Sequence, residues 1–149
     1  MNKTLLTALF SLPLLATACN MNSIKLEHAY VRAMPAGQQT TAAYMLIDNK
    51  CDKELEITGV SSPAAGKVEL HDVTMEDGVA KMHSIETLTL PAKEVTKLVP
   101  GSKHLMLIDV KQTLKPGSSI AMTLNFKDGS SKTIAVPVKD IRNEHEPGT

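Results

Sequence analysis

Two pairs of histidine and methionine residues have the spacing expected of metal ligands. His104 and Met106 alternate with leucines in an apolar run, so in a strand both side chains point to the same face. His71 and Met82 lie on either side of Asp77-Gly78. This step is a strong hairpin signal because a two-residue type I′ turn needs positive φ at both central residues. The sequence therefore predicts two imidazole–thioether pairs, each on one face of a sheet.

The predicted hairpin also fixes how His71 and Met82 lie relative to each other. With a two-residue turn, Val73 pairs with Met82 and His71 pairs with Ser84. His71 and Met82 are then diagonal neighbours on one face, with Cβ atoms about 7–8 Å apart or slightly closer. Metal–ligand bonds of about 2–2.3 Å would let the two side chains lean together and share one ion.

The donor types indicate which metal such a site would hold. Thioether sulfur is soft and imidazole nitrogen is intermediate, so the set favours Cu(I) over Zn(II), Mg(II) or Ca(II). Cys51 lies in a turn well upstream, which gives no support for a blue-copper site with a thiolate ligand. A lone histidine at a strand end is usually a surface residue, and a lone methionine usually fills the core. The paired spacing is therefore what favours metal binding here.

Short apolar runs separated by turn residues predict an all-β protein. Steps such as Pro116-Gly117 and Asp128-Gly129 interrupt the chain, and no segment keeps a helical period. Strands of this length and spacing are typical of a sandwich or barrel, and 149 residues suit a single domain. Strands are expected at residues 26–33, 41–48, 54–61, 67–75, 79–90, 94–98, 104–110, 119–127 and 131–139.

The N-terminal segment is expected to direct export. Residues 1–18 have a basic start, a short apolar stretch and the small residues Ala16-Thr17-Ala18 before Cys19, which is the pattern of a signal peptide. Cys19 would then be the first residue of the mature chain. It could be lipidated and anchor the protein to a membrane, or it could stay free and pair with Cys51. The remaining boundaries are predicted as a flexible lead-in at 19–25, the folded domain at 26–139 and a disordered tail at 140–149.

The four residues of the two pairs occur at the spacing His-x10-Met-x21-His-x-Met, which resembles the signature of the periplasmic copper chaperone PCu(A)C family. The stretches 29–35 and 100–107 are also similar to that family, and the resemblance extends from about Ile24 to Val138. It implies a cupredoxin-like Greek-key β-sandwich with a Cu(I) site near solvent. The implied ligands are His71, Met82, His104 and Met106.

The same resemblance implies a periplasmic copper chaperone that is not an enzyme and that delivers copper to the copper centres of cytochrome oxidase. The recipient would be an oxidase subunit or another copper chaperone. Two departures from the family pattern matter. Many members have methionine directly after the first histidine, where this chain has Asp72, and many have a tail rich in histidine and methionine, where this chain has only His145.

Other functions have less support from the sequence. A formal net charge of zero without a Lys/Arg block argues against nucleic-acid binding. A histidine-dependent hydrolase lacks a recognisable nucleophile motif, whereas a copper-storage or resistance protein would share the same site. The remaining histidines and methionines are given ordinary roles. His28 and His83 are expected at the surface, and Met34 and Met45 are expected to pack rather than to assist the site.

Overall fold

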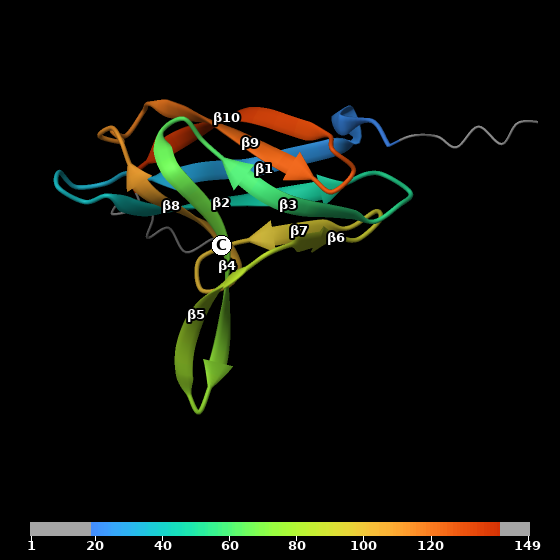
Figure 1. Cartoon of the computed structure of the whole chain (residues 1–149), viewed down its shortest axis with the longest axis horizontal. Coiled ribbons are helices and arrows are strands. Elements are labelled where there is room, and N and C mark those ends of the chain that lie inside the picture. The colour runs from blue at the N-terminus through green and yellow to red at the C-terminus, as the bar shows by residue number, and fades with distance from the viewer. Residues whose placement is uncertain (1–18, 141–149) are drawn as a thin grey trace, which may run out of the picture.

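The computed structural model describes residues 19–140, and strands make up most of that range (Figure 1). The predicted signal peptide 1–18 and residues 141–149 of the predicted tail lie outside the described residues. The strands are β1 (Ile24–Arg32), β2 (Thr40–Asn49), β3 (Leu55–Ser61), β4 (Ala65–Glu76), β5 (Val79–Ile85), β6 (Leu88–Leu90), β7 (Val95–Leu98), β8 (His104–Val110), β9 (Ser119–Phe126) and β10 (Ser131–Lys139). The all-β prediction is confirmed. No helix among residues 19–140 has the length and apolar character needed to cross a membrane.

Apart from β7, which pairs with β2, these strands form one hydrogen-bonded path that closes on itself. Its order is β5-β4-β8-β2-β1-β10-β9-β3-β6, and a further pairing of Val60 in β3 with Val68 in β4 closes the circuit. Strands β1 and β10 run parallel, through Val31 and Val138, whereas their other pairings are antiparallel. This closed arrangement of strands agrees with the β-sandwich that was expected.

The core lies between the two layers and is aliphatic. In β8, Leu105 and Leu107 are fully buried, while His104 and Met106 point to the opposite face because side chains alternate along a strand. In β2, Met45 and Ile47 are likewise buried in the core. One face of β8 therefore packs into the core, and the other carries the candidate donor residues His104 and Met106.

Strands β4 and β5 extend beyond the sandwich as a hairpin arm, seen below the body in Figure 1. Asp77 and Gly78 have φ of 51° and 77°, which is the left-handed conformation that a type I′ turn requires. The predicted register is confirmed, with Val73 opposite Met82. No residue of β5 is buried, so we call residues 72–83 the arm and treat it as separate from the core.

The run predicted as one strand at 79–90 is two strands. Residues 79–85 form β5 and pair with β4, whereas Leu88 and Leu90 of β6 pair with β3 and are buried in the core. Glu86 and Thr87 fall between the two strands. The division occurs because the chain changes its pairing partner, and a continuous β-forming run gives no local sign of that change.

Residues 19–25 are part of the fold rather than the flexible lead-in that was expected. The short 3₁₀ helix η1 (Met21–Ser23) is capped by the Asn20 side chain, and Ile24 is fully buried at the start of β1. Cys19 forms a disulfide with Cys51, with Cα atoms 5.7 Å apart. The structure therefore shows the disulfide, which was one of the two alternatives left open for Cys19.

Candidate metal centre

The structure places the two predicted histidines side by side. His71 of β4 is directly opposite His104 of β8, and their ring centroids are 5.7 Å apart. One step along the same face, Glu69 is opposite Met106. The sequence could not show this pairing, since β5, β6 and β7 separate the two strands in the chain.

His104 is held by the turn that precedes it. Gly101 has φ of 80°, a conformation that glycine adopts without steric cost, and the backbone N–H of Ser102 donates to the carbonyl of Val99 at 3.1 Å. The Ser102 carbonyl lies 2.9 Å from His104 Nδ1. Because a carbonyl can only accept, Nδ1 carries the proton in a neutral ring and Nε2 has the lone pair. The ring of Tyr44 packs beside this imidazole with centroids 6.2 Å apart.

His71 has the opposite arrangement of its ring nitrogens. Its Nε2 donates to Glu69 Oε2 at 2.8 Å, so Nδ1 is the lone-pair nitrogen of the neutral ring. That Nδ1 is buried and has no hydrogen-bond partner. Buried polar atoms nearly always have a partner, so this nitrogen is the clearest sign of a ligand-binding position in the described structure.

Glu69 is kept ionised for its contact with His71. Lys67 hydrogen-bonds to it, with Nζ 2.5 Å from Oε1. This contact, followed by the hydrogen bond from His71, lowers the pKa of the Glu69 carboxyl below its ordinary value. A carboxylate that accepts from a ligating imidazole fixes the tautomer and raises the basicity of the donor nitrogen. Glu69 was not predicted from the sequence as a partner of His71, although it precedes His71 by two residues and therefore shares its face.

The methionines lie diagonally on either side of His71. Met82 is opposite Val73 on the arm, and Met106 is opposite Glu69. Both methionines are therefore within reach of His71 on one continuous face formed by β8, β4 and β5. Met106 is half-buried, whereas Met82 is 53% exposed.

Asp72, the residue after His71, lies on the face of β4 that points away from the site. Its carboxylate lies 3.0 Å from Lys103 Nζ, and this contact is the main reason that the pKa of Asp72 is lowered. Lys103 immediately precedes His104, so the ion pair ties the turn before β8 to the base of the arm. The Asp72 carboxylate therefore points toward Lys103 and not toward the candidate metal centre.

The other candidate residues behave as expected. His28 and His83 are exposed, and the register puts His83 on the opposite face of the arm from Met82. Met45 is buried in the core, and Met34 packs against its edge.

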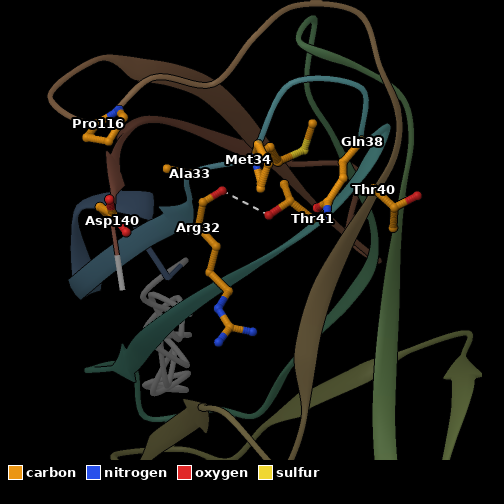
Figure 2. Close-up of a pocket in the computed structure, with 9 residues that line it drawn as sticks. Arg32, Ala33, Met34, Gln38, Thr40, Thr41, Pro116 and Asp140 are labelled. Carbon is orange, nitrogen blue, oxygen red and sulfur yellow. Dashed lines mark hydrogen bonds between the residues drawn. The ribbon is translucent and has the colours of Figure 1, made fainter. Parts of the chain in front are cut away.

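A separate cavity of about 410 Å³ is lined by Met34, Arg32 and Thr41 among others, but by none of the four proposed ligands. Figure 2 shows the Thr41 hydroxyl donating to the Arg32 carbonyl, at 2.9 Å, while the guanidinium points away. Over residues 19–140, no group of three or more His, Cys, Asp and Glu side chains is placed to hold a metal ion.

Comparisons with known proteins agree on one family. Residues 24–138 match the LpqE-like family model, described as "Putative lipoprotein LpqE-like". The protein "Putative lipoprotein Lxx21020" of Leifsonia xyli subsp. xyli is 33% identical over 126 residues, which cover 84% of this chain and 75% of the relative.

Two solved structures share the fold. A copper-bound PCuAC domain from PmoF2 has a TM-score of 0.67 and 27% identity, covering 79% of this chain and 93% of that domain. The Cu(I) form of DR1885 from Deinococcus radiodurans has a TM-score of 0.64 and 34% identity, covering 77% of this chain and 76% of DR1885. The chain thus belongs to the LpqE-like family and has the cupredoxin-like fold of the PCuAC copper chaperones.

Proposed function

We propose that this protein is a periplasmic copper chaperone that carries Cu(I) on His71, Met82, His104 and Met106. The observation that carries the proposal is the unpartnered, buried Nδ1 of His71 beside the ring of His104. Two imidazoles with opposite tautomers offer one lone pair each, from Nδ1 of His71 and from Nε2 of His104. A metal ion would satisfy a nitrogen that otherwise has lost its hydration without compensation.

The donor set fits monovalent copper. Cu(I) prefers soft donors, and thioethers are neutral, so Met82 and Met106 would bind it without releasing a proton. Glu69 would supply a nearby negative charge without acting as a ligand, because its oxygens are used by Lys67 and His71. The site would carry a metal as cargo, which distinguishes it from an active site that transforms a substrate.

Delivery requires that the metal be reachable by a recipient. The candidate centre lies on the outer face of the sheet, and Met82 is more than half exposed, so a recipient could exchange its own ligand for this thioether first. We propose the copper centres of cytochrome oxidase as the destination, reached directly or through another copper chaperone. This destination rests on the family and on the carrier chemistry of the site.

We propose that the protein is exported and works in an oxidising compartment. The Cys19–Cys51 disulfide supports this location, because disulfides persist in the periplasm and are rare in the cytosol. The family and its relative are described as lipoproteins, yet a Cys19 sulfur bonded to Cys51 cannot carry a lipid at the same time. The mass of the purified mature protein before and after reduction distinguishes an acylated Cys19 from a disulfide-bonded one.

Anaerobic Cu(I) titration against a competing chelator tests the proposed function. We expect one equivalent of Cu(I) to bind, with a sulfur K-edge signal from thioether–copper bonds. His71→Gln should abolish tight binding, whereas His83→Gln should not. His83 is the matched control because it lies on the same arm, facing away from the site. Equal affinity in both variants and in the unmodified protein would contradict the proposal.

A further inference from the structure

The far half of the arm exposes a second thioether. Met75 in β4 is 67% exposed, the largest exposure among the large hydrophobic side chains of the described residues. It lies next to the last residue of β4, close to the turn at Asp77-Gly78. Burial of an apolar side chain is favourable, but the arm offers no core in which Met75 could be buried.

The register connects Met75 to the candidate metal centre through Met82. Val73 is opposite Met82, and His71 and Met75 are the residues two before and two after Val73. Met82 is therefore a diagonal neighbour of His71 on one side and of Met75 on the other, all on one face. Methionine is long and flexible, so the Met75 and Met82 sulfurs can approach each other closely enough to share an ion.

The opposite face of the arm has a different composition. Thr74, Glu76, Val79 and Lys81 lie there, and Lys81 Nζ is 2.5 Å from Glu76 Oε2. Val79 is also exposed, at 59%, which makes it an apolar residue of the same arm without a sulfur atom. The two thioethers are thus gathered on the face that continues from the metal centre.

We propose that Met75 and Met82 form an outer Cu(I) site through which copper enters and leaves the centre at His71 and His104. This inference rests on the proposed function. Met82 would serve both positions, so that copper moves outward when its bond to a histidine breaks and a bond to the Met75 sulfur forms. Cu(I) keeps its oxidation state in this exchange, and neither thioether gains or loses a proton.

The test follows each methionine separately. Protein labelled with [methyl-¹³C]methionine is titrated anaerobically with Cu(I), and the ε-methyl signals are assigned with single Met→Leu variants. We expect the Met82 and Met106 signals to shift up to one equivalent of Cu(I), and the Met75 signal to shift or broaden over the same range, because the same ion exchanges between the centre and the outer site through Met82. Met82→Leu should remove the response of Met75.

Copper transfer to a chelator in excess supplies a second readout. Met75→Leu keeps the apolar volume but removes the sulfur, so it should slow transfer several-fold while affinity for the first equivalent and the melting temperature stay unchanged. Val79→Ala, the control on the opposite face, should transfer copper at the unmodified rate.

The outcomes separate the two proposals. A Met75 signal that never moves while those of Met82 and Met106 do would overturn the outer site and leave the proposed function intact. If no methionine signal responds, the proposed function fails as well. Unchanged transfer in Met75→Leu, or equal slowing in Val79→Ala, would show that the exposed face does not act through a thioether and would overturn the inference.

Discussion

The two histidines and Met82 of the candidate metal centre are held in different ways. His71 and His104 come from two paired strands of the sandwich, and each has one nitrogen fixed by a hydrogen bond, at 2.8 and 2.9 Å. Met82 comes from the arm, where it is 53% exposed. If the proposed ligands bind copper, the sandwich would set the position of the ion through His71, His104 and Met106, and the arm would add the exposed thioether of Met82 that another molecule can reach.

The largest expected effect on Cu(I) affinity comes from replacing one of the two histidines. Loss of an outer partner of a ligating histidine typically lowers metal affinity about 10–100-fold, so loss of the ligand itself should exceed that range. His104→Gln should therefore abolish tight Cu(I) binding, measured anaerobically against a competing chelator. Because His104 is 6% exposed, the melting temperature of the variant must also be compared with that of the unmodified protein. Retained affinity in a folded His104→Gln protein would show that the sandwich does not fix the metal.

The next largest effect on Cu(I) affinity comes from replacing one of the two proposed methionine ligands. Met82→Leu and Met106→Leu nearly conserve volume, so each should cost under about 1.5 kcal/mol of folding stability. Cu(I) affinity should nevertheless fall strongly, and Cu(II) binding through the two histidines should change less, because only Cu(I) depends on soft donors. Met34→Leu is the matched control, since Met34 packs against the core edge. Unchanged Cu(I) affinity in both site variants would remove thioether ligation.

A smaller effect is expected from the outer partner of His71. Glu69→Ala removes the acceptor that fixes the tautomer, so Cu(I) affinity should fall about 10–100-fold. Glu69→Gln keeps a carbonyl acceptor and should recover part of the loss, and ¹⁵N spectra of the ring report the tautomer directly. Glu56→Ala, which removes a carboxylate paired with Lys127 elsewhere, should leave affinity unchanged.

Acidification should weaken binding gradually through the histidines alone. A ligating imidazole must be neutral at its donor nitrogen, so protons compete with Cu(I) for both histidines and the Cu(I) affinity should fall as the solution is acidified. The decline should follow at most two protons. Protonation of Glu69 should not contribute to this decline at first. The pKa of its carboxyl is lowered, so Glu69 stays ionised to a lower pH than an ordinary glutamate. Affinity that stays constant into strongly acidic solution would contradict histidine ligation.

Local sequence determined the parts of this protein that depend on neighbouring residues. The Asp77-Gly78 turn fixed the register of the arm, and hence Val73 opposite Met82, because a two-residue turn leaves a single pairing. Alternation in β8 separated His104 and Met106 from the core leucines for the same local reason. The two His–Met pairs therefore follow from residue types and spacing, and the resemblance to the copper chaperones implied that the four residues form one ligand set.

Only the tertiary structure decided how the two pairs meet. Placing His71 opposite His104 requires the register of β4 against β8, which no turn specifies and which long-range core packing selects. The same packing divided residues 79–90 between the arm and the core and brought Cys19 to Cys51. The partners Glu69 and Ser102 likewise became evident only from geometry, because a tautomer depends on which atom lies within hydrogen-bonding distance.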